Sequence, residues 1–312
     1  MKRLFDFFHN AKGCHPNKRR VGLEIETLFI DKNGLPISFP LSQAIFVSLA
    51  KTGDWKIAKE KNGVITHLVN PGSDFELFYE LGWNNFELTT PTWLIEEIAW
   101  GEILANLDQL YSTAETLGAY PVFSFTDDCL LHDTLALPDK RDHIWAELDG
   151  RQALRVLGHI ATVHFNLDLV SLDQGMDYIR QINGYYSRAK SDPTSHQHDE
   201  IWMSYIRNSK AQYETDRYGF APDYSSYHYF RRLSELKVVM TCQNNKLKLC
   251  RLARPFSQTE AVNLDLFLRS VWWHSRLRVR GGTLVLELRN NLRGADEMIE
   301  EEWTKIKQIL GL

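Results

Sequence analysis

Four strand-like segments of the chain carry charged or polar side chains at alternate positions, where the interior of a strand usually disfavours Glu. The segments are RVGLEIETLFID (20–31), NNFELTT (84–90), HIATVHFNLDL (159–169) and TLVLELRNN (283–291). Their polar members are Glu24 and Glu26, Glu87, His164 and Asn166, and Glu287 and Arg289. Side chains two positions apart in a strand lie on one face. We therefore expect a sheet with one polar and one apolar face, the polar face lying either in solvent or in a cleft.

The rest of the chain mixes helical and strand-like segments without regular alternation. The spacing of apolar residues predicts helices over residues 1–13, 41–52, 94–117, 145–157, 172–189, 260–277 and 295–310. Two further strand-like pieces, VITHLV and FELFYEL, precede the NNFELTT segment, and residues 82–85 between the last two predict a hairpin turn. No repeat or linker divides the sequence. These patterns favour an α+β fold with a mainly antiparallel sheet, formed as a single domain over residues 1–312.

Composition argues against several classes of protein. The chain has 36 Lys and Arg against 40 Asp and Glu, a net charge of -4 that offers no electrostatic basis for general nucleic-acid binding. It contains no apolar run of about 18 residues, so we expect no membrane span and no membrane partner. The first residues lack the apolar core of a secretory signal. The cysteines, Cys14, Cys129, Cys242 and Cys250, form no CxxC pair and are typical of free thiols in a reducing cytoplasm.

Several carboxylates in one cleft would need compensation. Two carboxylates about 4 Å apart repel by about 1 kcal/mol in water and about 4 kcal/mol at an effective dielectric constant of about 20. Such a cleft would hold cations or keep protons. Oxygen ligands with one imidazole suit Mg²⁺ or Mn²⁺ better than zinc. Glu80 lies an odd number of positions before Glu87, so it reaches the same face only if the turn at residues 82–85 resets the alternation.

At these segments the sequence resembles glutamate–cysteine ligase and the wider glutamine-synthetase-like carboxylate–amine ligases. KGCHPNKRRVGLEIETLFID is similar to the ligase segment around the G-x-E-x-E strand, and NNFELTTP to the E-L-x-x-x-P strand. ATVHFNLDL is similar to the strand that carries the family's His, and EIWMSYIRNSKAQYETDRYGFAPD to its IW…D-x-R-x-G…P segment. LVLELRNNLRGAD resembles the closing (I/L)-E-x-R strand. The five matches occur in order between residues 11 and 296, while residues 118–150 do not align.

The resemblance implies a fold, a reaction and a set of ligands. The fold is glutamine-synthetase-like, with a curved sheet whose concave face is the active site and helices packed outside. The reaction uses ATP and two or three Mg²⁺ ions, with Mn²⁺ as an alternative, to convert a carboxylate into an acyl phosphate that an amine attacks. The implied metal ligands are Glu24, Glu26, Glu80, Glu87, His164 and Glu287. FEL at 75–77 competes with FEL at 86–88 for one of these positions, so Glu76 is the alternative to Glu80; we favour Glu87 because TTP follows it.

Arginines complete the implied site. Arg289 would face the γ-phosphate, so Arg289 and Glu287 are the implied catalytic residues. Arg280 is the member of the alternating set Arg276, Arg278 and Arg280 chosen as a phosphate contact, and Arg217 in DRYGF would bind a carboxylate or a phosphate. The set shares a face only if its strand starts early. No GxxxxGK[ST] loop occurs, so ATP would be held through metals and arginines.

Three functions remain open at this stage. The first is an enzyme most like glutamate–cysteine ligase, joining the γ-carboxylate of L-glutamate to an amino acid or amine, as in glutathione biosynthesis. The second is an amidoligase of the same superfamily that acts on a peptide or another small amine in a specialised pathway. The third is a catalytically inactive nucleotide-binding relative. The expected partners are small-molecule substrates, and the protein is expected to be cytoplasmic and either a monomer or a homodimer.

Overall fold

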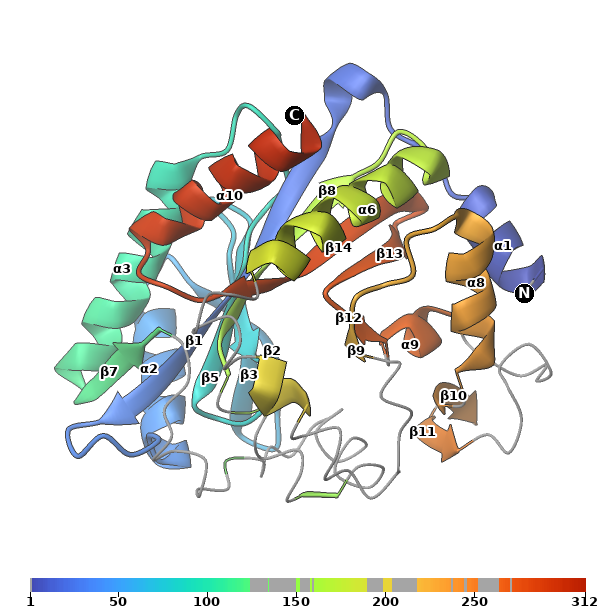
Figure 1. The fold of residues 1–312 in the computed structure, drawn as a ribbon. Helices are drawn as coiled ribbons and strands as arrows, with labels where there is room; N and C mark the ends of the chain where they lie inside the picture. The colour runs from blue at the N-terminus through green and yellow to red at the C-terminus, as the bar shows by residue number, and fades with distance from the viewer. Residues whose placement is uncertain are drawn as a thin grey trace.

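The structure is a computed structural model of the chain. It describes residues 2–123, 134, 150–151, 158, 160–189, 199–203, 218–236, 238–243, 246–251, 264–269 and 271–312. Within this part of the chain, the main sheet has ten strands, eight of them in the order β13-β14-β8-β1-β5-β4-β3-β2, with β6 and β7 also paired to β1 (Figure 1). All of its pairings are antiparallel. The predicted α+β fold with a mainly antiparallel sheet is confirmed.

The strands of the main sheet are β1 (Arg20–Asp31), β2 (Lys56–Lys61), β3 (Val64–Asn70), β4 (Phe75–Tyr79), β5 (Asn85–Thr89), β6 (Trp93–Leu94), β7 (Ala119–Val122), β8 (Thr162–Asp168), β13 (Ser275–Arg280) and β14 (Thr283–Leu292). The helices are α1 (Lys2–His9), a short 3-10 helix (Pro16–Lys18), α2 (Phe39–Thr52), α3 (Trp100–Thr116), α6 (Leu172–Ala189), α8 (Ser226–Glu235), α9 (Leu264–Arg269) and α10 (Glu297–Leu310). Two small pairs complete the strands: β9 (Tyr218–Gly219) with β12 (Trp272–Trp273), and β10 (Val238–Gln243) with β11 (Lys246–Arg251).

Helices cover the apolar face of the main sheet. Phe165 of β8 is fully buried and stacks on Trp303 of α10, with ring centroids 5.3 Å apart. At the other end, Tyr79 of β4 stacks on Phe46 of α2 at 4.6 Å. Figure 1 shows α6 and α10 running along β8 and β14. The alternation seen in the sequence therefore separates a helix-covered core from an opposite polar face.

Strand register aligns the polar positions across this opposite face, because directly opposed residues of antiparallel strands share a face. The opposed pairs are Glu24 with His164, Glu26 with Glu87, Asn166 with Glu287, and Glu287 with Arg276. In the β4–β5 hairpin, Phe78 lies opposite Glu87, so the even-numbered positions of β4 share a face with the odd-numbered positions of β5. The turn therefore resets the alternation, as the Glu80 prediction requires. Its Gly82 has a φ of 82°, a left-handed conformation that favours glycine.

Several predicted helix boundaries are wrong. The helix expected over residues 260–277 ends at Arg269, and β12 and β13 follow it. The alternation Arg276-Leu277-Arg278-Val279-Arg280 has the two-residue period of a strand, and β13 pairs with β14 along its whole length. The helix expected from residue 94 begins at Trp100, because Trp93 and Leu94 pair with β1. The expected helix at 145–157 lies mostly outside the described residues.

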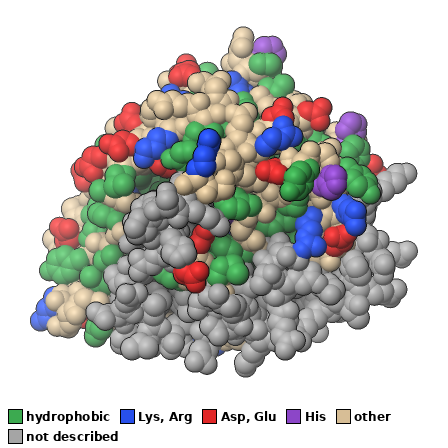
Figure 2. Space-filling model, in the orientation of Figure 1, with side chains coloured by type: hydrophobic (Ala, Val, Ile, Leu, Met, Phe, Trp, Pro, Cys, Tyr) green, Lys and Arg blue, Asp and Glu red, His purple; other side chains and the backbone are tan. Residues whose placement is uncertain are grey.

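Acidic and basic side chains are interspersed among the described residues on the face shown in Figure 2. No described helix is both long and apolar enough to cross a bilayer. Cys14 is a free thiol, whereas the side chains of Cys129, Cys242 and Cys250 lie outside the described ones. The main sheet draws strands from residue 20 to residue 292, which supports our proposal of a single domain.

The contact between α10 and β8 gives a stability prediction. Trp303 is 1% exposed, so Trp303→Ala should lower the free energy of unfolding by about 3–5 kcal/mol through lost burial and a residual cavity. Chemical denaturation measures this change. The neighbouring exposed Thr304 supplies the control, since Thr304→Ala should change stability by no more than about 0.5 kcal/mol. Equal stability of the two variants would contradict the assigned packing.

Candidate active site

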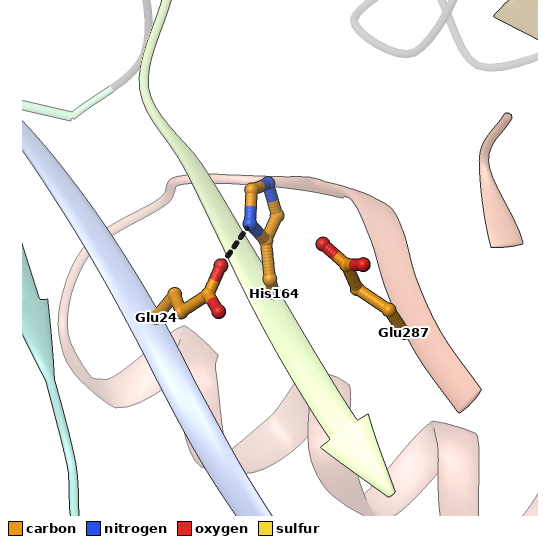
Figure 3. A group of neighbouring side chains, drawn as sticks. All are labelled: Glu24, His164 and Glu287. Atoms are coloured by element: carbon orange, nitrogen blue, oxygen red, sulfur yellow. Dashed lines mark hydrogen bonds and ion pairs between the residues drawn. The ribbon is translucent and has the colours of Figure 1, made fainter. Parts of the chain in front are cut away.

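The polar face brings six of the predicted ligands together in two groups. Among the described residues, one ligand atom each of Glu24, His164 and Glu287 lie within 4.8 Å of one another (Figure 3). We call this group the histidine cluster. The same distance holds for Glu26, Glu80 and Glu87, which we call the carboxylate cluster. The two groups are adjacent, because β1 contributes Glu24 to one and Glu26 to the other.

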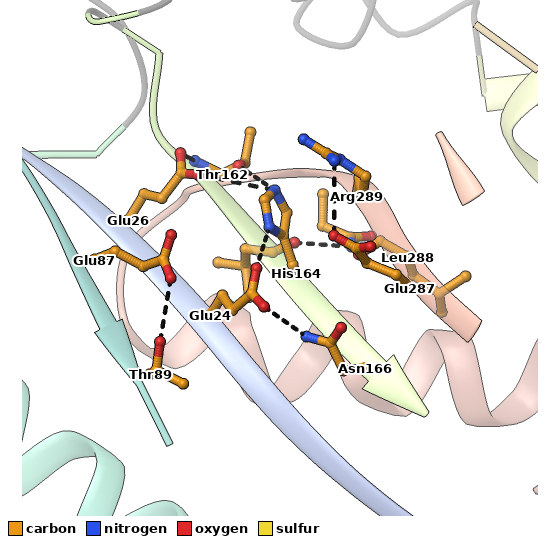
Figure 4. A network of polar contacts seen from close by, with 12 residues as sticks. Glu24, Glu26, Glu87, Thr89, Thr162, His164, Asn166, Glu287, Leu288 and Arg289 are labelled. Atoms are coloured by element: carbon orange, nitrogen blue, oxygen red, sulfur yellow. Dashed lines mark hydrogen bonds and ion pairs between the residues drawn. The ribbon is translucent and has the colours of Figure 1, made fainter. Parts of the chain in front are cut away.

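Hydrogen bonds fix the histidine cluster (Figure 4). Nδ1 of His164 lies 2.9 Å from Glu24 Oε2, and Nε2 lies 2.8 Å from Thr162 Oγ1. Asn166 donates to the other oxygen of Glu24 at 3.2 Å. An ionised Glu24 can only accept, so the geometry places the imidazole proton on Nδ1. Ligation of a cation through Nδ1 would require the imidazole proton to lie on Nε2, from which it could be donated to Thr162 Oγ1.

Arginines supply positive charge to the same cluster. Arg276 binds Glu287 through two parallel contacts of 2.6 and 2.9 Å, and Arg280 reaches Glu24 Oε1 at 2.7 Å. Burial alone would raise the pKa of Glu24, but His164 and Arg280 lower it well below its usual range. The pKa of Glu287 is likewise lowered, because Arg276, Arg289 and Arg278 outweigh its burial. Both carboxylates are therefore held ionised.

The carboxylate cluster has the opposite electrostatics. Glu26 and Glu87 are 5% and 6% exposed. Glu26 accepts from the backbone N–H of Thr162 at 2.9 Å, and Glu87 accepts from Thr89 Oγ1 at 3.1 Å. Burial raises the pKa of Glu26, and burial together with the charges of Glu24 and Glu26 raises the pKa of Glu87 further. A divalent cation would relieve this repulsion and release the retained protons.

The donor set fits a hard divalent cation. It consists of carboxylate oxygens from five residues and one imidazole, and neither cluster includes a cysteine. Mg²⁺ and Mn²⁺ prefer such oxygen ligands, whereas structural zinc sites favour Cys and His. The two neighbouring clusters could hold two ions.

The structure also separates the alternatives left open by the sequence. Glu80 joins the carboxylate cluster, whereas Glu76 is 47% exposed and pairs with His67 at 3.1 Å. The placement therefore favours Glu80 over Glu76. Arg289 lies at the site, with Nη1 3.6 Å from Glu287 Oε1. Arg217 lies outside the described residues.

Sequence analysis missed residues that support the ligands. It named Arg276, Arg278 and Arg280 and chose only Arg280 as a site residue, whereas β13 begins at Ser275 and places all three on the face of Glu287. Their R-x-R-x-R alternation was the available signal. Thr89 and Thr162, which donate to Glu87 and Glu26, carried no signal because their roles depend on strand register.

Similarity between this chain and known proteins is found among solved structures. No family model matches the chain, and no curated protein matches it. Among solved structures, it is similar to the 2.0 Å crystal structure of glutamate–cysteine ligase (gshA) from Francisella tularensis in complex with AMP. The TM-score is 0.41 at 10% sequence identity, and the alignment covers 96% of this chain and 68% of that chain.

The raised pKa of Glu87 predicts a pH dependence of stability without metal. The folded state retains a proton that the unfolded chain releases near pH 4.5, so the contribution of Glu87 is full below that pH and declines as pH rises toward the folded-state pKa. Glu87→Gln cannot ionise and should lose less stability than the wild type as pH rises above 4.5. Urea denaturation in EDTA measures this. Glu115 is exposed, so Glu115→Gln is the control and should show the pH dependence of the wild type. If the free energy of unfolding of Glu87→Gln changed with pH in parallel with that of the wild type, the prediction would be contradicted.

Proposed function

We propose that this chain is an ATP- and Mg²⁺-dependent carboxylate–amine ligase that forms an amide bond through an acyl phosphate. One observation carries the proposal: the histidine and carboxylate clusters adjoin on one sheet face, beside arginines from β13 and β14. Such a face suits a substrate that brings its own negative charges. A nucleoside triphosphate and a carboxylate together are such a substrate pair.

The chemistry explains why cations and arginines would occur together. Attack of a carboxylate on the γ-phosphate of ATP brings anions into contact. Bound Mg²⁺ would neutralise this charge and align the transfer. The residues of the chain would hold the ions through the two clusters, and arginine would stabilise the charge that develops on the transferred phosphoryl group.

Exposure distinguishes the arginines that could reach a phosphate. The side chains of Arg280 and Arg289 are 42% and 16% exposed, whereas Arg278 is 6% exposed. Arg289 also contributes to lowering the pKa of Glu287, so its charge lies next to a proposed metal ligand. We assign Arg289 to the γ-phosphate and Arg280 to the remaining phosphates. A planar guanidinium matches phosphate geometry better than a lysine does.

The choice of a carboxylate and an amine as the reacting groups depends on the sequence motifs. The G-x-E-x-E, E-L and E-x-R segments resemble carboxylate–amine ligases in the correct order. L-glutamate is the proposed carboxylate donor, and an amino acid is the first acceptor to test. An acceptor that is a peptide or small amine is the second version. An inactive relative is disfavoured because six proposed ligands and two accessible arginines converge.

The experiment that tests the reaction uses hydroxylamine as a small neutral trap. An enzyme that makes an acyl phosphate should release ADP and form a hydroxamate when given ATP, Mg²⁺, hydroxylamine and L-glutamate. A panel of amines followed by product mass then identifies the acceptor. A γ-glutamyl–cysteine product would exclude the second version. No ADP with glutamate and any acceptor at saturating Mg²⁺ would contradict the glutamate version.

Removing one ligand from each cluster should abolish most activity. Glu26→Gln and Glu287→Gln should each lower the turnover number by at least about 100-fold, comparable with losing a strong electrostatic stabiliser. Initial-rate measurements of ADP release test this. Glu115→Gln, on the exposed side of α3, should keep the wild-type rate. A ligand variant with the rate of this control would have no part in the site.

Arg289 should not tolerate lysine. Arg289→Lys keeps the charge but loses the planar fork, so kcat/KM for ATP should fall by at least about 10-fold. ATP titrations at saturating Mg²⁺ give this value. Unchanged ATP kinetics would refute the assignment of Arg289 to the γ-phosphate.

A further inference from the structure

We infer that Arg276 is a positioning residue that orients Glu287 toward the cation of the histidine cluster and does not contact the nucleotide; this inference rests on the proposed function. In the sequence, Arg276 belongs to the alternating set Arg276, Arg278 and Arg280, from which only Arg280 was chosen as a phosphate contact. The structure gives it a different environment from Arg280, although each pairs with a ligand of the same cluster.

The contacts of Arg276 use most of its hydrogen-bonding capacity. Nε donates to Glu287 Oε2 at 2.6 Å, and Nη2 donates to Glu287 Oε1 at 2.9 Å. Nη1 donates to the backbone carbonyls of Leu268, at 2.8 Å, and Val271. These bonds engage four of the five N–H donors of a guanidinium. Arg276 is 4% exposed, so it cannot reach a phosphate without breaking this set.

The two carbonyls explain why the arrangement is rigid. Leu268 is a buried residue of α9, and Val271 leads into β12. Arg276 itself lies opposite Glu287 in the β13–β14 register. The guanidinium is therefore fixed by backbone on one side, and it fixes the plane of the carboxylate on the other.

Arg280 provides an internal contrast. It lies at the end of β13 and reaches Glu24 Oε1 through Nη2 at 2.7 Å. Its side chain is 42% exposed. Arg280 can therefore leave Glu24 when a cation arrives and turn to a phosphate, whereas Arg276 remains on Glu287.

Orientation of Glu287 should matter for cation binding. A carboxylate that ligates a metal is itself usually hydrogen-bonded, and loss of such a partner typically costs about 10–100-fold in metal affinity. Lysine at position 276 would keep the positive charge but offer no bidentate fork. The variant Arg276→Lys thus separates orientation from charge.

The test is a Mn²⁺ titration of the purified 312-residue chain without nucleotide, with free Mn²⁺ followed by electron paramagnetic resonance. Two classes of site are expected in the wild type, one for each cluster. Arg276→Lys should raise the Kd of one class by about 10-fold and leave the other unchanged. Arg231→Lys, at an exposed arginine of α8 that pairs with Glu235 away from both clusters, is the control and should leave both Kd values within about 2-fold.

A double-mutant cycle tests whether Arg276 affects Mn²⁺ binding through Glu287. In a Glu287→Gln background, Arg276→Lys should cause no further change in Mn²⁺ binding. An unchanged Kd for Arg276→Lys alone would overturn the inference, as would a parallel weakening of both classes. If Arg276→Lys changed the Mn²⁺ Kd equally in the wild type and in the Glu287→Gln background, the inference would also be overturned.

The titration is independent of catalysis. Wild-type protein that binds Mn²⁺ in two classes but releases no ADP would contradict the proposed function and leave the role of Arg276 measurable. Wild-type protein that binds no Mn²⁺ would overturn both. Thermal unfolding in EDTA checks that both variants are folded at the temperature of the titration. Arg276→Lys should have a lower midpoint than Arg231→Lys, because buried hydrogen bonds to Leu268 and Val271 are lost.

Discussion

Cross-strand register is the constraint on which the rest of the structure depends. Backbone pairing of β14, β8, β1 and β5 places side chains from residues 24 to 287 directly opposite one another. The same pairing sends the intervening residues to the other face, where α6 and α10 cover them. Because the side-chain period of a strand is two, a slip of one residue would exchange these faces and bury the charges in the core. The packing of the core and the assembly of the site therefore depend on the same strand register.

Burying several carboxylates on one sheet face costs electrostatic free energy, and the two clusters differ in how their charge is compensated. Arginines of β13 and β14 hold Glu24 and Glu287 ionised. Glu26 and Glu87 are buried with raised pKa values and so retain affinity for a proton or a cation. The two clusters are therefore expected to differ when empty. One has its charge balanced by the protein, and the other would be balanced from solution.

The arginines show how burial separates roles that sequence cannot. Arg276 and Arg280 lie four residues apart on the same strand face. Arg276 is enclosed by Glu287 and two backbone carbonyls, whereas Arg280 is partly exposed. A buried guanidinium with its donors used is suited to fixing another side chain. A partly exposed one is suited to meeting a ligand.

The sequence by itself determined the alternation of polar and apolar residues and the α+β class, which follow from the local periodicity that each strand carries in its own residues. The six candidate ligands were named from the resemblance of these segments to carboxylate–amine ligases. Only the tertiary structure decided that Glu80 joins the carboxylate cluster and Glu76 does not. Both lie on the polar side of the hairpin, but only Glu80 lies close to Glu26 and Glu87, whereas Glu76 pairs with His67. The strand at residues 275–280 is encoded locally by the alternation from Arg276 to Arg280, but only the tertiary structure decided that Arg276 lies opposite Glu287. The physical reason is that register and burial are set by contacts between segments far apart in the chain, which no local pattern encodes.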